Sequence, residues 1–219
     1  EELSYIRSVS SQACEMARMQ REGRLPIRVT HNDTKINNVL FDRNTNRALT
    51  IIDLDTVMPG LVGHDFGDAI RFAANFVEED SPRADKAGVN LNVYWAFAEG
   101  FLKETAATLT PREVETLGLS CFALACELAT RFLDDYIVGD KYFKIKNAEH
   151  NLVRTRCQIA LAKDMLLKMD ADTVSAINVR ENLIDRMEVE ISNYLIKMTD
   201  QELNDDESHE AVSYTHLTL

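Results

Sequence analysis

The sequence predicts a mainly helical α+β domain in which a small β-element holds a group of polar residues. Apolar residues recur at helical spacing near the start of the chain and through most of its second half. Two short apolar runs, Val39–Phe41 and Leu49–Ile52, flank a segment rich in turn-forming residues and predict a β-hairpin. The 219 residues are 45% apolar, which is enough for one or two helical subdomains around a real core.

The first third of the chain is predicted to carry all the strands. Pro26 ends a linker, and the β-branched residues after it favour a strand that leads into His31. Pro59, Gly60 and Gly63 break regular structure after the hairpin. The expected elements are a helix over 2–22, a strand over 27–30, hairpin strands over 39–41 and 49–52, and a loop over 56–63.

The remainder is predicted to be helical. Asp65 is a candidate N-cap for a helix whose buried side reaches Phe76. Thr110, Pro111 and Glu113 together form a capping-box start signal for a largely apolar central helix that Gly139 closes. The expected elements are a helix from Asp65, a polar loop over 78–88, and helices over 91–107, 111–136, 146–169 and 172–201.

One segment carries the chemistry. It reads His31-x-Asp33-x-Lys35-x-x-Asn38, and Asp53 and Asp55 follow the second strand of the hairpin. This is the residue set that phosphoryl transfer requires, in the order of a kinase catalytic loop. Asp33 would accept or orient the proton of an acceptor hydroxyl, and Lys35 would meet the γ-phosphate. Asn38 and Asp53 offer the hard oxygen ligands that Mg²⁺ favours.

Each of these residues also has an ordinary structural interpretation. A single His-x-Asp pair is common, and an aspartate at a strand end is often a cap. The register of five polar residues on both sides of one hairpin favours the catalytic interpretation. His31 is better explained as a strut that hydrogen-bonds the loop than as a proton carrier.

Composition excludes several classes of function. A net charge of −12 argues against nucleic acid and anionic membranes as partners. No apolar run reaches the roughly 18–20 residues of a membrane span, and no signal peptide opens the chain, so we expect a cytoplasmic protein. The four cysteines lack the spacing of a zinc site or a disulfide framework, and the five histidines are scattered.

The segments HNDTKINNVLF and IIDLDTVMPGLVGHDFGDAIR resemble the aminoglycoside phosphotransferase/choline kinase superfamily, whose members are protein-kinase-like. Within it, the IDLDTVMPGL segment and the block Ala129–Gln158 are most similar to bacterial N-acetylhexosamine 1-kinases. The resemblance implies a kinase that uses ATP as co-substrate and Mg²⁺ as cofactor to phosphorylate a small molecule. An N-acetylhexosamine phosphorylated at its anomeric hydroxyl is the acceptor that it implies.

The resemblance also implies roles for individual residues. Asp33 matches the catalytic base, Lys35 the residue facing the phosphate, and Asn38 and Asp53 the Mg²⁺ ligands. Asp65 or Asp68 matches an aspartate that braces the catalytic loop, and Asp55 either orders the metal site or caps the hairpin. Arg131 and Tyr142 match positions that face the sugar, although Arg131 could equally pair with Asp134 or Asp135.

The chain departs from the family in one respect. Such kinases grip the α- and β-phosphates with a lysine in an amino-terminal lobe, whereas the first lysine here is Lys35. We therefore expect residues 1–211 to form a carboxy-terminal lobe that has little turnover alone. Residues 212–219 resemble a translated sequencing adapter, and we expect them to be a non-native tail.

Other functions remain open at this point. The same fold serves aminoglycoside, choline, homoserine and methylthioribose kinases. A choline site would need an aromatic cage, and the few aromatic residues weakly disfavour it. A non-catalytic kinase-like binding protein is the alternative from another class. The sequence does not determine the oligomeric state.

Overall fold

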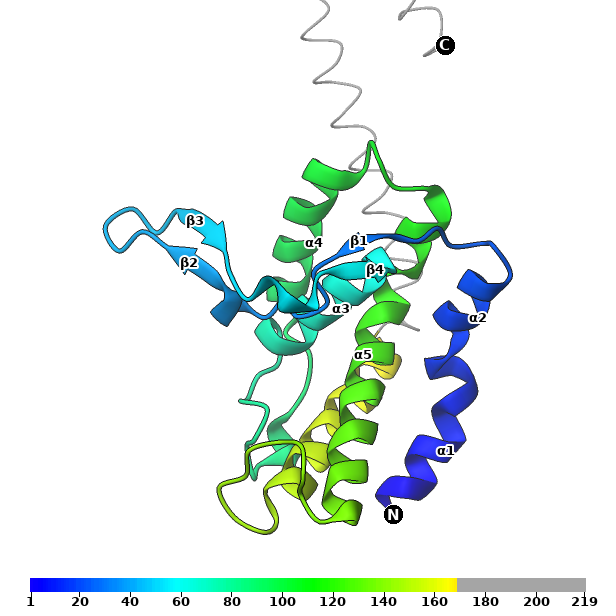
Figure 1. Cartoon of the computed structure of the whole chain (residues 1–219), viewed down its shortest axis with the longest axis vertical. Coiled ribbons are helices and arrows are strands. Elements are labelled where there is room, and N and C mark those ends of the chain that lie inside the picture. The colour runs from blue at the N-terminus through cyan, green and yellow to red at the C-terminus, as the bar shows by residue number, and fades with distance from the viewer. Residues whose placement is uncertain (169–219) are drawn as a thin grey trace, which may run out of the picture. The chain divides into compact units, whose positions relative to one another are not determined.

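The structure is a computed structural model that describes residues 1–168. Within these residues, helices build the body and four short strands lie on one side of it (Figure 1). The long helices are α1 (Glu2–Ala13), α2 (Glu15–Arg21), α3 (Val62–Ala73), α4 (Leu91–Thr105), α5 (Pro111–Val138) and a helix over 150–168. The mainly helical α+β prediction agrees with this composition.

The strands form two separate antiparallel pairs. In the first, β1 (Arg28–Thr30) pairs with β4 (Met58–Gly60), so that Thr30 lies opposite Met58. In the second, β2 (Val39–Phe41) pairs with β3 (Ala48–Ile51) as the predicted hairpin, which projects from the helical body (Figure 1). The segment His31–Asn38, which the sequence predicts to carry the chemistry, runs from the end of β1 to the start of β2.

Strand β4 was missed, because Pro59 and Gly60 look like loop residues. Pro59 is tolerated in a strand of a two-stranded sheet, where one edge needs no partner. Gly60 is required by the close approach of β1, since a Cβ at that position would lie 2.4 Å from the hydroxyl oxygen of Thr30. The pairing brings the chain after Asp55 back beside the strand that precedes His31.

Two helix boundaries differ from the prediction. The helix expected over 2–22 is interrupted at Cys14, whose backbone (φ −89°, ψ 4°) departs from helical geometry. The break allows Met16, on α2, to pack in a small apolar cluster with Leu25 and Leu61. Helix α3 begins at Val62 rather than after Asp65, so Asp65 lies in its first turn and is not the N-cap.

Helices α3 and α5 form the centre of the core. Phe66 and Ile70 of α3 are fully buried against Cys121 and Phe122 of α5, and α4 packs its aromatic residues around Phe66. The close approach depends on Gly67, where a Cβ would lie 2.6 Å from the backbone oxygen of Ser120. A small residue at this position therefore sets the distance between α3 and α5.

Helix α5 has both predicted ends. Thr110 and Glu113 form a complete capping box at its start, and Gly139 ends it in the left-handed conformation (φ 92°). Contrary to expectation, α5 is long and apolar enough to span a bilayer. However, 72% of its most apolar window is buried by the rest of the protein, as in the core helix of a globular domain.

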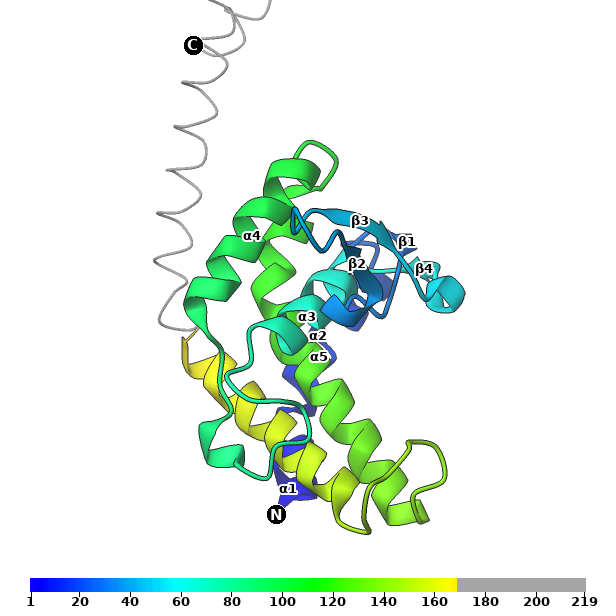
Figure 2. The same cartoon turned by 90° about the vertical axis from the view of Figure 1, so that its left-hand side faces the viewer.

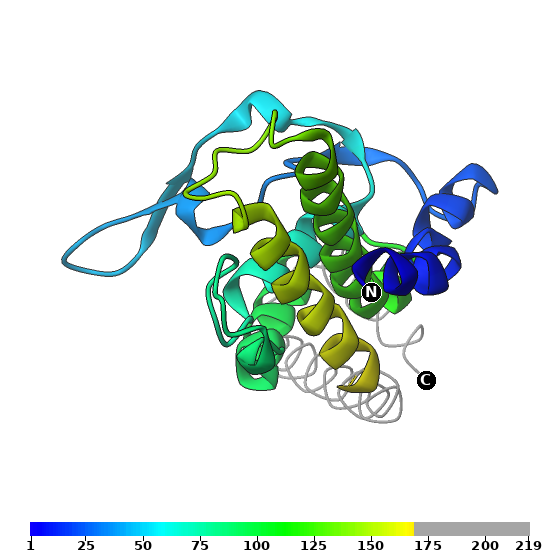
Figure 3. The ribbon, with the colours of Figure 1, turned by 90° about the horizontal axis from the view of Figure 1, so that it is seen from below.

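The last described helix, residues 150–168, lies alongside α5 when the protein is viewed from below (Figure 3). It starts four residues later than predicted, after a loop over 139–149 that returns from the end of α5. Figure 2 shows this helix and α4 on the side of the molecule away from the strands. The helix predicted over 172–201 and the tail over 212–219 lie outside the described residues.

Candidate active site

Three predicted residues meet in the loop between β1 and β2. The Asp33 carboxylate oxygen Oδ2 accepts hydrogen bonds from Lys35 Nζ at 2.8 Å and from Asn38 Nδ2 at 2.9 Å. Asn38 also donates to the backbone oxygen of Asp33 at 2.8 Å and is buried in the 3₁₀ turn Ile36–Asn38. Asp33 and Lys35 remain a quarter to a third exposed. The carboxylate is therefore held from one side and open on the other.

His31 supports this loop through both ring nitrogens. Nδ1 lies 3.3 Å from the backbone nitrogen of Asp33, and Nε2 lies 3.1 Å from the backbone oxygen of Ile52. An N–H needs an acceptor and a carbonyl needs a donor, so the neutral tautomer with its proton on Nε2 satisfies both contacts. This geometry favours a strut over a proton carrier.

Asp65 clamps the start of the loop from helix α3. Its two carboxylate oxygens accept the backbone N–H groups of His31 at 2.9 Å and of Asn32 at 2.7 Å. Asn32 has a positive φ of 64°, a strained conformation for a residue other than glycine. The two hydrogen bonds to Asp65 offset that strain and orient the chain into Asp33.

Asp68 does not share this role. Its carboxylate is buried and accepts from Arg71 at 2.8 and 3.1 Å, and Arg71 also pairs with Glu79 at 2.6 Å. Asp68 therefore pairs with Arg71 within α3, and Arg71 links the helix to Glu79 in the polar loop that follows it. Of the two aspartates expected to brace the loop, only Asp65 hydrogen-bonds to it.

Thr56 and Asn32 also hold the loop in place, and the sequence analysis did not predict this role. The Thr56 hydroxyl donates to the backbone oxygen of His31 at 2.7 Å, and the Asn32 side chain donates to the backbone oxygen of Thr56 at 3.0 Å. Asn32 is the residue from which this arrangement could have been predicted. Asparagine is enriched at positive φ, and its short side-chain amide can hydrogen-bond to nearby backbone groups. These bonds join the segment before Asp33 to the one after Asp53.

Asp53 occupies a left-handed conformation (φ 64°) directly after the hairpin. Its neighbour Ile52 donates a backbone hydrogen bond to the backbone oxygen of Asn38 at 2.9 Å, so the chain at Asp53 runs beside Asn38. Asp55 lies exposed in the following 3₁₀ turn, Leu54–Thr56. Within residues 1–168, no group of three or more His, Cys, Asp or Glu side chains gathers as a metal site.

Asn38 and Asp53 nevertheless offer the kind of oxygen donors that a magnesium ion takes. Such an ion takes one or two protein oxygens and completes its octahedron with phosphate oxygens and water. The amide nitrogen of Asn38 is directed to Asp33, which leaves its oxygen Oδ1 for another partner. A carboxylate and an amide oxygen on adjoining segments supply a suitable pair of donors.

The two predicted acceptor residues lie together at the far end of α5. The guanidinium of Arg131 is 5.8 Å from the ring centre of Tyr142 and 5.5 Å from that of Phe143. Its ion pair is with Glu127 at 3.6 Å, so the alternative pairing with Asp134 or Asp135 is wrong. Tyr142 is 74% exposed, which leaves one face of the ring open to a ligand.

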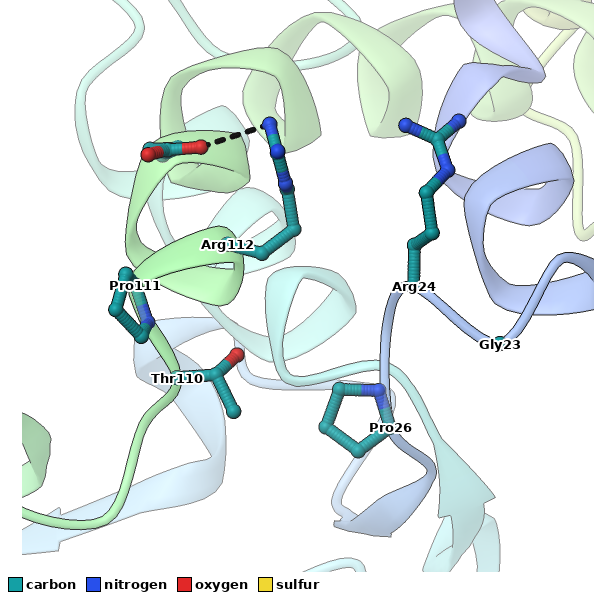
Figure 4. Close-up of a pocket in the computed structure, with 7 residues that line it drawn as sticks. Gly23, Arg24, Pro26, Thr110, Pro111 and Arg112 are labelled. Atoms are coloured by element: carbon teal, nitrogen blue, oxygen red, sulfur yellow. Dashed lines mark ion pairs between the residues drawn. The ribbon is translucent and has the colours of Figure 1, made fainter.

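Two surface hollows lie outside the catalytic loop. One, of about 460 Å³, lies between the linker at Gly23–Pro26 and the start of α5, where Arg24 and Arg112 flank it (Figure 4). Arg112 is paired there with Glu115. The other, of about 590 Å³, lies between the loop after α3 and the start of the helix over 150–168. None of the predicted site residues lines either hollow.

Comparison with protein families agrees with this geometry. Residues 9–101, fewer than half of the 219, match the model of the phosphotransferase enzyme family (APH). The matched region extends from α1 into α4 and contains the whole loop between β1 and β2, together with Thr56 and Asp65. The match supports a phosphotransferase of the aminoglycoside phosphotransferase and protein-kinase-like superfamily.

Proposed function

We propose that this protein is an ATP- and Mg²⁺-dependent kinase that phosphorylates the anomeric hydroxyl of an N-acetylhexosamine. The observation that carries the proposal is the Asp33–Lys35–Asn38 cluster on a loop clamped by Asp65 and His31. Kinases need positioned charge more than covalent chemistry, and this loop holds its charged groups by hydrogen bonds from several elements.

The hydrogen bonds around Asp33 suggest a separate role for each residue in the proposed reaction. Lys35 and Asn38 both bind Oδ2 of Asp33, so Oδ1 is the oxygen available to an acceptor hydroxyl. Asp33 would orient that hydroxyl and take up its proton as the phosphoryl group transfers. Lys35 would move from Asp33 to the γ-phosphate when nucleotide binds, which frees the carboxylate at the moment it is needed.

Asn38 and Asp53 would hold the metal. When bound, Mg²⁺ neutralises charge on the phosphate oxygens. The backbone hydrogen bond between Ile52 and Asn38 would keep the two ligands in register with Asp33. Asp55, two residues after Asp53, would bind water around the ion.

The preference for a sugar rests on Arg131 and Tyr142. An exposed tyrosine ring supports the apolar face of a pyranose, and a guanidinium donates to its hydroxyl or carbonyl oxygens. A polycationic aminoglycoside would be repelled by Arg131 but attracted by the net charge of −12, so it is the main competing acceptor. Choline, homoserine and methylthioribose complete the set to be tested.

We further propose that a separate nucleotide-binding lobe covers the strands. Large apolar side chains stand exposed along β2 and β3, including Phe41 (45%), Leu49 (64%) and Ile51 (56%). Apolar side chains gathered in this way are typical of a surface that another structural unit buries. Residues 1–211 alone would then bind acceptor but transfer phosphate slowly or not at all.

A substrate screen tests the proposal. The protein, together with the proposed nucleotide-binding lobe, would be incubated with Mg²⁺-ATP and N-acetylglucosamine, N-acetylgalactosamine, choline or an aminoglycoside, and ADP release would be measured. We expect turnover with a hexosamine and a product whose phosphate is lost in mild acid, as glycosyl phosphates are. Turnover with only choline or an aminoglycoside would refute the acceptor, and no turnover with any would favour a non-catalytic binding protein. Fast transfer by residues 1–211 alone would refute the need for a second lobe.

A further inference from the structure

The loop over 139–149 is organised around a single buried carboxylate. Asp135, on the last turn of α5, is 4% exposed. It accepts three consecutive backbone N–H groups, from Lys141 and Tyr142 at 2.8 Å each and from Phe143 at 2.9 Å. Asn151, fully buried on the next helix, donates to the same carboxylate at 2.9 Å. Four donors thus converge on one side chain.

The backbone makes this convergence possible. Gly139 and Asp140 both have positive φ, 92° and 54°, which reverses the chain at the end of α5. The Asp140 N–H then bonds the backbone oxygen of Asp135 at 2.7 Å, and the next three N–H groups point inward at its carboxylate. Such a concave run of N–H groups binds an anion, and here the anion is part of the same chain.

The clamp decides where the neighbouring aromatic side chains lie. Phe143 packs inward against Phe132, with ring centres 4.7 Å apart, and is in edge contact with Tyr142 at 4.8 Å. Tyr142 is consequently left facing outward, and the Arg131 guanidinium rests near both rings. Without the carboxylate, the N–H groups of Lys141, Tyr142 and Phe143 would lose their acceptor, and the loop would have to rearrange.

We propose that Asp135 is a positioning residue for acceptor recognition. It acts through the backbone of residues 141–143 to hold Tyr142 beside Arg131 as a preformed binding surface. This inference rests on the proposed function, since it assumes that the acceptor binds at this pair. It differs from a merely structural role in one respect: loss of the clamp should weaken sugar binding more than it lowers the stability of the fold.

The test compares Asp135→Asn with Asp134→Asn. Asp134 is the adjacent residue and is exposed, so its substitution removes the same charge without touching the loop. Amide hydrogen exchange would report the N–H groups of 141–143, titration with N-acetylglucosamine would report acceptor affinity, and thermal unfolding would report stability. In the wild type and in Asp134→Asn we expect slow exchange and equal affinity.

In Asp135→Asn the amide presents an N–H group to backbone donors, so we expect faster exchange at 141–143. We also expect the dissociation constant for the sugar to rise about tenfold or more, because small misplacement of positioning groups is costly. Unchanged exchange, or faster exchange with unchanged affinity, would overturn the proposal. If Asp135→Asn fails to fold, Asn151→Ala, which removes one of the four donors, serves as the second variant with the same expected direction.

The two proposals can fail separately. If the wild-type protein binds no N-acetylhexosamine at all, the proposed acceptor is wrong, and the acceptor role of Asp135 falls with it. If the wild type binds the sugar and Asp135→Asn binds it equally well, only the positioning role is wrong.

Discussion

Arg28 and Glu113, which are 85 residues apart in the sequence, form a two-point ion pair between strand β1 and the first turn of α5. The guanidinium donates from Nε to one carboxylate oxygen at 2.6 Å and from a terminal nitrogen to the other at 2.7 Å. The same carboxylate accepts the backbone N–H of Thr110 at 2.8 Å as part of the capping box. One side chain therefore starts α5 and fastens to it the strand that leads into the catalytic loop.

We expect Glu113→Gln to destabilise the protein by roughly 2 kcal/mol, since it weakens both a helix cap and a largely desolvated charge-assisted pair. Thermal unfolding at neutral pH would measure the loss. Arg112→Gln is the matched control, because Arg112 and Glu115 form an exposed pair on the same turn, and pairs of this kind contribute little. Equal losses in the two variants would contradict the double role of Glu113.

The same pair predicts how stability depends on pH. Its hydrogen bonds with Arg28 lower the pKa of Glu113 from its usual 4.5, although burial opposes the shift. A lowered pKa in the folded state gives stability that is present above pH 4.5 and is lost as the pH falls through the folded-state value. The difference in unfolding free energy between wild type and Glu113→Gln should therefore shrink in acid. A difference that grew below pH 4.5 would show the opposite shift.

Asp33→Asn should abolish phosphoryl transfer while leaving acceptor binding largely intact. An amide cannot take up the hydroxyl proton, and loss of a positioned base costs about 10²- to 10⁴-fold in rate. Steady-state kinetics would measure the rate, and titration would measure sugar affinity. A near-normal rate would show that another group is the base.

Asp65→Asn should lower the rate through the loop rather than through the chemistry. Asparagine retains one acceptor oxygen but presents an N–H to the second backbone donor, so either His31 or Asn32 loses its bond. We expect faster hydrogen exchange at these two amides and a lower kcat with little change in the unfolding midpoint. Asp68→Asn is the informative comparison, because Asp68 is bonded to Arg71 and should affect stability more than exchange in the loop.

Two glycine substitutions separate the effect of close helix packing, at Gly67 on α3, from that of helix propensity, at Gly100 on α4. Gly67→Ala places a methyl group 2.6 Å from the backbone oxygen of Ser120, so we expect a loss of about 1–3 kcal/mol from overpacking. Gly100→Ala, on α4, meets no atom within 4 Å and should raise stability by up to about 1 kcal/mol through helix propensity. Chemical denaturation of both variants would measure the two changes in unfolding free energy, which are expected to have opposite signs. A neutral Gly67→Ala would show that the helices can separate at no cost.

Local signals made much of the fold predictable. The capping box at Thr110, the stop at Gly139 and the hairpin around residues 42–47 each rest on residues a few positions apart, and each prediction is confirmed. Strand β4 and the early start of α3 were missed because they depend on contacts with β1 and α5 rather than on their own sequence. The break at Cys14 also depends on a tertiary contact, because it allows Met16 to pack with Leu25 and Leu61.

The candidate site also has one part that local sequence signals predict and one part that depends on contacts between distant residues. The order of polar residues from His31 to Asp53 predicts a catalytic segment from the sequence alone, and the structure brings Asp33, Lys35 and Asn38 of that segment together. The contacts that organise it are not visible in that order: Thr56 and Asn32 bind backbone, and Asp135 collects N–H groups from a loop that begins four residues later. Side chains that bind distant or irregular backbone leave no periodic pattern, so sequence reasoning passes over them.

Gly67 and Asp65 stand two residues apart on α3, one against Ser120 of α5 and the other against the backbone of the catalytic loop. Helix α3 therefore connects the close contact with α5 to the hydrogen bonds that hold the loop around Asp33. A substitution that separates α3 from α5 at Gly67 is expected to shift Asp65 as well, because both residues lie on the same helix. We therefore expect variants near Ser120 to change the loop around Asp33 as well as the stability of the core.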